Sequence, residues 1–523
     1  MTNYIIKRFL RGVLSVVLVT GIVMVLIYSC LDRNLIFAND PVYTRQKNNA
    51  KEVYKMQQWE NYGYVSYVPY ADFLQELFRD GQITPEEYAT AGKLGDRKAQ
   101  DSKLTARFTE QFTQHYQSQG YQVIRLDAKT RGAKYQEGGE PRLFAFRDVP
   151  VSQRLLRYIT GLITVDSIHY VQEDIPHRGL TFTLYDPAYG GNKFSPAILG
   201  NGTFHKYLLY FDSQFPFVHQ NFININMGAS YSVNAGVDVY DTMTTPQGSF
   251  VYSDVYYPSG AVERSADDLH SATYVAGSLA EGTAVVKRHF TDDYTGVSTH
   301  KSGLSKLGYS FTIGILAVLL SYLAAIPLGI AMARHKDGLA DRLGTLYIIF
   351  ILAVPSLAYI FLFKSIGGRL GLPTTFDMEK TSWRMYLLPV ISLALPAVAN
   401  LSKWLRRYMI DQKNADYVKF ARAGGLSEGE IFRKHILRNA IIPIAHGIPA
   451  GILGALTGAI ITERVYVVPG AGNLLTTAIN LYDNGVIVGM TLFYAVLSVA
   501  SVILGDILIS VMDPRISFAS KER

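Results

Sequence analysis

The chain is poor in cysteine, with Cys30 as the one cysteine among 523 residues. An intramolecular disulfide is therefore excluded, and any region outside a membrane must be stabilised by its own core. The chain also lacks the GxxxxGK(S/T) loop that cradles nucleotide phosphates, the HExxH zinc motif and the GxSxG nucleophile elbow. Its histidines are scattered without metal-ligand spacing. We therefore expect no catalytic residue, no metal site and no nucleotide bound by this chain itself.

Long apolar runs are missing from residues 32–305, yet six occur in the rest of the chain. A helix needs about 20 apolar residues to cross a bilayer. A helix in a soluble core keeps one polar face, so this series of runs is typical of an α-helical polytopic membrane protein. The six predicted spans are 12–31, 307–333, 343–363, 385–402, 439–462 and 484–505.

Basic residues are distributed unevenly among the segments that would connect these spans. The N-terminal tail, loops 334–342 and 403–438 and the C-terminal tail together carry 18 Lys and Arg, against five in loops 364–384 and 463–483. Cytoplasmic loops are enriched in Lys and Arg. Both termini are therefore predicted to be cytoplasmic, and residues 32–305 to lie outside the cell.

The N-terminal run allows a second interpretation. Three basic residues precede it, as in a secretory signal, and Ser29-Cys30 hints at a lipoprotein cleavage site. Tyr28 is too bulky for the small residue usual there, and the run is long enough to span. We therefore predict a retained first helix, which forms a first domain of residues 1–31.

The segment 32–305 differs in composition, since it holds 23 of the 35 tyrosines. Helical spacing predicts a helix at 70–78 and another at 102–119, and Thr84-Pro85 fits a helix start. Residues 153–171 fit an amphipathic helix on the membrane surface. Later runs between glycine-rich turns favour strands and irregular loops, as at 180–185, 207–211 and 249–253.

A mixed α/β domain outside the membrane is therefore predicted between the first and second spans. Its many tyrosines either fill a half-polar core or form a contact face for a partner, because tyrosine suits interfaces. We take the histidines of this domain as structural or surface groups.

The cytoplasmic loop 403–438 is the most informative segment. Gly424 and Gly425 are expected to end one helix, because glycine accepts left-handed backbone angles. Ser427 then caps a second helix, and Glu430 three residues on completes a capping box. Ile431 and Phe432 would form an apolar knob with a charged rim, which is typical of a docking element. The alternative is an ordinary loop with basic anchors.

This loop resembles the coupling loop of binding-protein-dependent ABC importers. Lys419, Phe420 and Ala421 stand where that motif has Glu-Ala-Ala, and Gly425 stands at its glycine. Leu437-Arg438 replaces the usual Leu-Pro, but the oligopeptide branch of the family commonly has this variation. Residues 421–427, 437–443, 326–331, 463–475 and 512–516 all resemble that branch. The outer insertion is similar to that of the enlarged B-type permeases of Gram-positive peptide systems, especially at 189–221.

The resemblance implies a type I importer permease fold, with a five-helix core at 306–523. It implies four kinds of partner: two cytoplasmic ATPases that bind ATP and Mg, a second homologous permease, an extracellular lipoprotein that binds peptide, and membrane lipid, but no nucleic acid. It also implies the plasma membrane of a Gram-positive bacterium. The implied ATPase-coupling residues are Lys419, Ala421, Ala423, Gly424, Gly425, Leu426, Ser427, Glu430, Ile431, Phe432 and Arg433.

Polar residues in or beside the spans are candidates for the translocation path, because such groups are costly in lipid. The candidates are Asn400, His446, Thr457 and Glu463. The alternative is that each pairs with a neighbouring helix. Asp506, near the inner end of the last span, is expected to have a pairing or capping role.

Other functions remain open on the sequence. The same architecture serves nickel, glycoside and antimicrobial-peptide systems. A membrane-anchored receptor is disfavoured because it would not need the 421–427 signature. An anchored enzyme is disfavoured because it would need a set of catalytic residues, which we do not find in the sequence. The sequence therefore predicts a peptide permease subunit.

Overall fold

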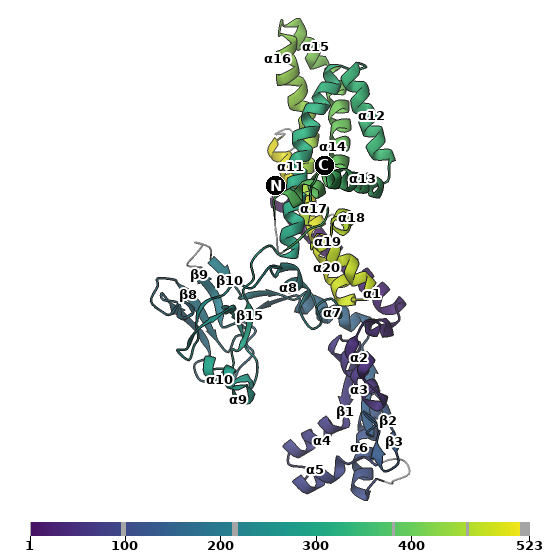
Figure 1. Ribbon diagram of the computed structural model, residues 1–523, viewed down its shortest axis with the longest axis vertical. Coiled ribbons are helices and arrows are strands. Elements are labelled where there is room, and N and C mark those ends of the chain that lie inside the picture. The colour runs from purple at the N-terminus through teal and green to yellow at the C-terminus, as the bar shows by residue number, and fades with distance from the viewer. Residues whose placement is uncertain (1, 96–100, 212–217, 379–381, 457–459, 513–523) are drawn as a thin grey trace.

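The computed structural model describes residues 2–95, 101–211, 218–378, 382–456 and 460–512. Figure 1 shows an elongated molecule with a helical part at the top and centre, one lobe at the bottom and another at the left. We call residues 33–148 lobe 1 and residues 163–299 lobe 2. Helix α7 (Val151–Gly161) lies between them in the chain. The predicted outer domain thus consists of two lobes.

The helical part contains five helices that are each long and apolar enough to cross a membrane, and a sixth crossing if one bent pair is counted. The elements are α1 (Thr2–Cys30), α11 (Lys306–Arg334), α12 (Leu339–Ala353), α13 (Ser356–Arg369), α14 (Arg384–Lys413), α15 (Asp416–Ala423), α16 (Glu428–Glu430), the π-helix η3 (Ile431–Leu437), α17 (Arg438–Leu456), α18 (Ile460–Tyr466), α19 (Ala471–Asn480) and α20 (Asn484–Met512). A polytopic helical fold is confirmed.

The span predicted at 343–363 is not one continuous helix but a bent pair. Helix α12 ends at Ala353, α13 begins at Ser356, and the two are bent by 110°. Pro355 disfavours a helical conformation of the residue before it, and Val354 is extended, with φ −80° and ψ 131°. The bend therefore follows directly from the proline.

The span predicted at 439–462 begins earlier in the structure. Elements α16, η3 and α17 follow one another without a break, so that one candidate span runs over Glu428–Gly454. The short second helix of the cytoplasmic loop is therefore the beginning of this span and not a separate helix.

Helix α1 packs along α20 at the side of the helical part. A Cβ atom on Gly12 would overlap Val499, so glycine permits the close approach. Near the inner ends of the two helices Arg8 forms an ion pair with Asp506. This ion pair confirms the pairing role predicted for Asp506.

Lobe 1 packs helices on a three-stranded antiparallel sheet of order β1-β5-β2. Its core includes Phe73 and Leu74 of α4 and Phe112 of α6. The predicted helix starts are confirmed, since Thr84 forms a capping box and Ser102 caps α6. The elements are η1 (Arg33–Phe37), α2 (Pro41–Arg45), α3 (Asn48–Asn61), β1 (Val65–Pro69), α4 (Tyr70–Arg79), α5 (Pro85–Ala91), α6 (Lys103–Ser118), β2 (Gln122–Leu126), β3 (Thr130–Arg131), β4 (Lys134–Tyr135) and β5 (Arg142–Asp148).

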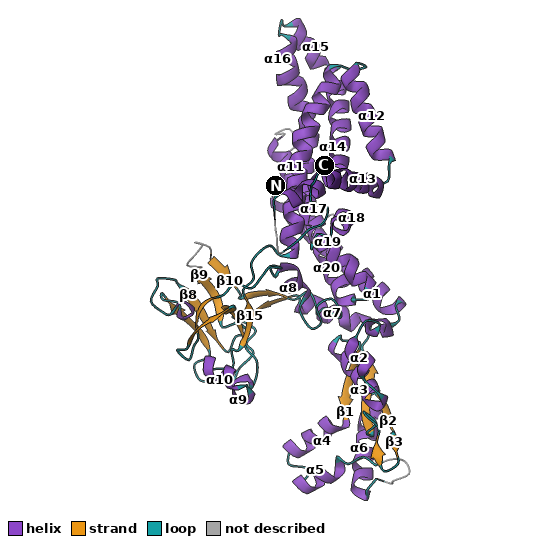
Figure 2. Ribbon diagram, in the orientation of Figure 1, coloured by secondary structure: helices purple, strands orange, loops and turns teal. Residues whose placement is uncertain are grey.

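Lobe 2 contains most of the strands, as Figure 2 shows. Its largest sheet is antiparallel, in the order β10-β9-β8-β7. The elements are β6 (Ile163–Val165), β7 (Gly179–Thr183), η2 (Pro187–Tyr189), β8 (Ala197–Asn201), β9 (Tyr207–Phe211), β10 (Val218–Gln220), β11 (Ile223–Ile225), α8 (Val239–Thr244), β12 (Ser253–Tyr256), β13 (Val262–Ser265), β14 (Asp267–Thr273), α9 (Ser278–Glu281), α10 (Ala284–His289) and β15 (Gly296–Thr299).

Two sequence predictions in this region need correction. The helix predicted at 153–171 ends at Gly161, because the following residues form β6 and pair with β11. The run 249–253 contributes only its last residue to a strand, and Phe250 makes an isolated bridge to Lys301. The strands predicted at 180–185 and 207–211 are confirmed as β7 and β9.

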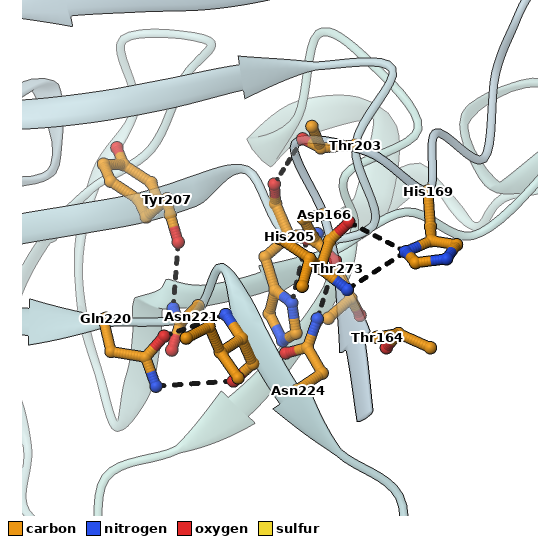
Figure 3. Close-up of polar contacts among 12 residues, drawn as sticks. Thr164, Asp166, His169, Thr203, His205, Tyr207, Gln220, Asn221, Asn224 and Thr273 are labelled. Carbon is orange, nitrogen blue, oxygen red and sulfur yellow. Dashed lines mark hydrogen bonds and ion pairs between the residues drawn. The ribbon is translucent and has the colours of Figure 1, made fainter. Parts of the chain in front are cut away.

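Two histidines of lobe 2, His205 and His270, lie in hydrogen-bond clusters. Figure 3 shows the buried carboxylate of Asp166 beside His205, whose backbone N–H donates to it at 2.7 Å, and Asn224, whose Nδ2 donates at 2.6 Å. The ring of His169 bonds instead to the backbone of Val165 in its own turn. This cluster therefore ties β6 and β11 to the turn before β9.

A second cluster surrounds His270 in β14. Its Nε2 lies 2.7 Å from Oδ2 of the fully buried Asp186, and its ring stacks on Tyr210 with centroids 4.2 Å apart. Burial alone would lower the pKa of His270, but the hydrogen bonds to Asp186 and Asp268 outweigh it and raise the pKa to about 9. His270 is therefore a buried cation at neutral pH.

Candidate coupling surface and outer junction

One end of the helical part, which we call the tip, consists of α15, a turn and α16 (Figure 1). Helix α15 ends at Ala423, and Gly425 has φ +80°, where a residue with a side chain is strained. The backbone N–H of Leu426 donates back to Ala421 O at 3.2 Å. Ser427 and Glu430 then form the predicted capping box. The turn is thus fixed by local geometry.

The tip is held on the membrane helices by a small apolar core. Val418 of α15 and Ile431 of η3 are both fully buried, and they pack with Leu405 and Met409 of α14. The tip and the inner end of α14 therefore form one packed unit.

The prediction that Ile431 and Phe432 form an exposed knob is wrong. Ile431 has no exposed surface, and Phe432 is partly buried, with the guanidinium of Arg334 5.1 Å from its ring centroid. The aromatic side chain with the largest exposed fraction in the described tip is that of Phe420, which is 75% exposed. Residues two positions apart on a helix point to nearly opposite sides, so Phe420 points away from the buried Val418. The helical spacing in the sequence therefore indicates that the two side chains differ in burial.

Two ion pairs lie on the surface of the tip, and one of them joins its two helices. The guanidinium of Arg422 contacts both carboxylate oxygens of Glu428, at 2.5 Å and 3.2 Å. Lys419 pairs with Asp416 in the same way at 2.8 Å. These groups are all exposed, and solvent screens them.

A buried ion pair clamps the inner ends of α12 and α14. Asp341, which is 3% exposed, accepts from Nε and Nη2 of Arg406 at 2.5 Å and 2.7 Å. The backbone N–H of Asp337 also donates to Asp341, at 2.9 Å. The two guanidinium nitrogens of Arg406 and the turn before α12 therefore fix the beginning of α12 beside α14.

The predicted path residues lie on different elements. Asn400 is exposed on α14, whereas His446 of α17 bonds through Nδ1 to Gly505 O of α20 at 3.0 Å. Glu463 is 1% exposed; it accepts from Ser310 of α11 at 2.7 Å and from the backbone of Asn473 at 3.1 Å. Thr457 lies outside the described residues. The contacts of His446 and Glu463 join helices, and a role of these residues in the path stays a prediction.

The turn between α18 and α19 is strained. Val467 has φ +58°, although it carries a β-branched side chain, and it is 56% exposed. Such conformations are rare and persist only where the surroundings impose them. Near this turn, Gly470 and Gly472 lie against the carboxylate of the buried Glu463. A Cβ atom on Gly470 would overlap that carboxylate, and one on Gly472 would crowd it.

The outer lobes join the helical part at a buried carboxylate that the sequence did not single out. Asp483, just before α20, is fully buried and accepts from the hydroxyl of Ser230 at 2.6 Å. It also accepts from three successive backbone N–H groups, those of residues 231–233, at 2.8 to 2.9 Å. The partners are about 250 residues apart in sequence, so no local pattern could have predicted this contact.

An apolar cluster extends this junction. Met227, Val239 and Met243 of lobe 2 pack on residues of α19 and α20, among them Leu474 and Met490. Within the described residues, no group of three or more His, Cys, Asp or Glu is placed to hold a metal. The described parts of the chain therefore contain a tip with an exposed surface and a junction held by buried contacts.

Comparison with known proteins shows which family the chain resembles. It matches the family described as "Binding-protein-dependent transport system inner membrane component" over residues 325–518. It is 34% identical to the "Oligopeptide transport system permease protein AmiC" of Streptococcus pneumoniae, over 100% of this chain and 99% of that protein. The "Dipeptide transport system permease protein DppB" of Lactococcus lactis is 31% identical over 40% of this chain and 69% of its own length.

Among solved structures, a chain titled "Crystal structure of an amino acid ABC transporter with histidines" matches 40% of this chain and 90% of its own, with 18% identity and a TM-score of 0.29. That likeness is too low to define the fold, so the assignment rests on the sequence relatives. The alignment with the pneumococcal permease covers the outer lobes as well as the helices. The chain therefore belongs to the oligopeptide permease family, the membrane subunits of binding-protein-dependent ABC importers, and is a transport subunit and not an enzyme.

Proposed function

We propose that this chain forms half of an oligopeptide path and that its cytoplasmic tip receives the force of separate ATPases. The observation that carries the proposal is the geometry of the tip. Gly425 and the capping box fix the turn, Phe420 projects from it, and η3 continues into a candidate span. Such a tip is suited to transmit movement, because it is stiff and its exposed aromatic residue is free to bind.

In this proposal Phe420 inserts into a groove on one ATPase, with the other implied coupling residues around it. ATP and Mg are bound by the ATPases. Their closure moves the tip as a rigid unit, and the unbroken helix from Glu428 to Gly454 carries the movement into the membrane. The π-helical turns at η3 lie where this force enters, and such turns are frequent at functional sites.

A second, homologous permease would complete the path. Asn400, exposed on α14, is the candidate that we retain for lining it, because its side chain is free to face a partner or the path. His446 and Glu463 would hold neighbouring helices in place. Peptides bring their own donors and acceptors, so a wide and mildly polar path suits many sequences.

Both termini are proposed to be cytoplasmic and the two lobes to face outward from a Gram-positive plasma membrane. A lipid-anchored binding protein would then deliver peptide to the outer side. Lobe 2 exposes Leu180 and Phe182 on β7, an edge strand of its sheet, and Phe194 nearby. Exposed apolar side chains of this kind are suited to contact a partner.

The test compares two glycines of the tip. Gly425→Ala places a side chain at φ +80°, whereas Gly429→Ala adds the same methyl group to an ordinary helical position with open space. We expect uptake of a labelled oligopeptide to fall at least about tenfold in the first variant, with the same amount of protein in the membrane, and to be unchanged in the second. Equal uptake in both variants would refute the role of the turn, and uptake of nickel or a glycoside in place of peptide would refute the substrate.

A further inference from the structure

A buried arginine without an acidic partner lies at the outer end of α1. Arg154 of α7 is 9% exposed, and its guanidinium carbon lies 3.5 Å from the ring centroid of Tyr28 and 4.1 Å from that of Tyr64. Its Nη2 donates to Tyr62 O at 3.3 Å. Among the described residues no carboxylate forms an ion pair with Arg154. Burying a cation is costly unless an anion or aromatic faces compensate it.

Arg154 faces a pocket of about 300 Å³. A second arginine, Arg157, lines the same pocket on the next turn of α7. The lining contains no aspartate or glutamate, so the pocket concentrates two positive charges. The other lining residues are Met24, Tyr28, Asn61, Tyr62, Gly63, Tyr158, Met227, Gly228, Ala229, Tyr231, Gly485 and Val488.

The pocket lies where the apolar surface of the spans ends. Met24 and Val488 belong to α1 and α20, and Tyr28 is in the last turn of α1. Ile22, Val25 and Leu26 of α1 are 49–59% exposed, which is expected of a face in contact with lipid tails. Leu156, between the two arginines of α7, is 63% exposed.

We propose that this pocket binds the phosphate of an anionic phospholipid from the outer leaflet. The guanidinium groups of Arg154 and Arg157 hold the phosphate oxygens, because an arginine fork matches that geometry. The acyl chains lie along the exposed face of α1, which includes Val25. An apolar surface that continues from the pocket fits a lipid better than it fits a soluble anion or the carboxylate of a passing peptide.

Such a lipid would brace the junction between the lobes and the spans. The pocket is lined by α1, α7, both lobes and α20, so one bound headgroup touches every part that meets there. The site is independent of what the permease transports. A negative result in the lipid-binding test would therefore leave the proposed function untouched.

The test measures phospholipid that stays bound to the full-length chain, purified with its partner subunits, by native mass spectrometry. Phosphatidylglycerol and phosphatidylcholine of the same acyl chains are the probes. We expect the wild type to retain phosphatidylglycerol preferentially and Arg157→Gln to retain about tenfold less, since one charge-assisted contact is removed. Arg131→Gln, in the exposed hairpin β3–β4 of lobe 1, is the matched control and should behave as the wild type.

Arg154→Lys serves as the second variant, because it keeps the buried charge and removes the fork. Reduced retention in both arginine variants, with an unchanged control, would establish the site. Wild-type retention in both would overturn it. Displacement of the lipid by millimolar inorganic phosphate would assign the pocket to a free anion, and displacement by a peptide with a free but not an amidated C-terminus would assign it to peptide; either result would overturn the proposal.

Discussion

The outer junction and the tip both join another segment of the chain to the candidate spans, but by opposite kinds of contact. At the outer junction the fully buried Asp483 accepts hydrogen bonds from one hydroxyl and three backbone N–H groups. At the tip the side chains of the ion pairs Asp416–Lys419 and Arg422–Glu428 are 47–81% exposed. Buried polar contacts are costly to lose, whereas exposed ion pairs contribute little.

The difference indicates where each region is stiff. The outer lobes are fastened to α20, so they are expected to move with it as one body. The tip is stiff through its backbone geometry and through Val418 and Ile431, and its surface charges are free to meet a partner. We expect substitutions at the outer junction to loosen structure and substitutions on the surface of the tip to change binding.

The largest effect is expected at Asp483. In Asp483→Ala the backbone N–H groups of residues 231–233 and of Val486 and the hydroxyl of Ser230 lose their acceptor, at about 1–3 kcal/mol for each group left unsatisfied. Hydrogen exchange of residues 230–237 should then accelerate roughly a hundredfold or more, as measured by mass spectrometry. Asp254→Ala, on the exposed side of β12, should leave this exchange unchanged. Unchanged exchange in Asp483→Ala would show that the junction is held by other contacts.

The buried cation of lobe 2 predicts a pH dependence. The pKa of His270 is raised to about 9 in the folded lobe, above its ordinary value of 6.5. The charged His270 therefore contributes to the free energy of unfolding of lobe 2. This contribution, at most roughly 3 kcal/mol, is fully present below about pH 6.5 and is lost as the pH rises through 9. Proteolysis of lobe 2 should accelerate over this range in the wild type and should lose that acceleration in His270→Gln. Equal pH profiles of the two proteins would contradict the buried ion pair with Asp186.

A smaller effect is expected in the core of the tip. Val418→Ala removes two buried methyl groups between α15 and α14, at a cost of about 2 kcal/mol. Hydrogen exchange of α15 should accelerate about thirtyfold, while that of the outer lobes stays the same. Acceleration in the lobes as well would mean that the two ends are not separate units.

The smallest effect is expected for the surface ion pairs. Arg422→Gln and Glu428→Gln alter groups that water screens, so hydrogen exchange of α15 should match the wild type with or without added salt. If exchange accelerated as much as in Val418→Ala, the ion pair would be a principal support of the tip, and the contrast between the two regions would fail.

Local features could be predicted from the sequence because their causes are local. Gly425 and the Ser427–Glu430 capping box depend on residues within one turn, as does the helix start at Thr84. The apolar runs likewise predict membrane helices, since length and composition decide whether a helix can span. Pro355 is also a local signal, but a proline alone does not distinguish a bend within one span from a break between two helices.

Contacts between distant segments could not be predicted. Asp483 meets residues 230–233, and Arg154 meets tyrosines from α1 and lobe 1, and no spacing in the sequence indicates either contact. The assignment of Ile431 as exposed failed for a related reason: the residues that bury it, Leu405 and Met409, lie on α14. Which apolar side chain of a docking segment faces its own protein depends on that packing.

The most direct measurement of the central claim is a cross-link from the tip to its ATPase. Replacing Cys30 by serine leaves no cysteine, and Phe420→Cys then places a single thiol at the exposed tip. With a thiol-to-amine reagent on the intact complex, we predict a covalent product with an ATPase subunit from Phe420→Cys and none from Leu156→Cys on the exposed side of α7. An intact complex in which Phe420→Cys gives no product with an ATPase would contradict the account.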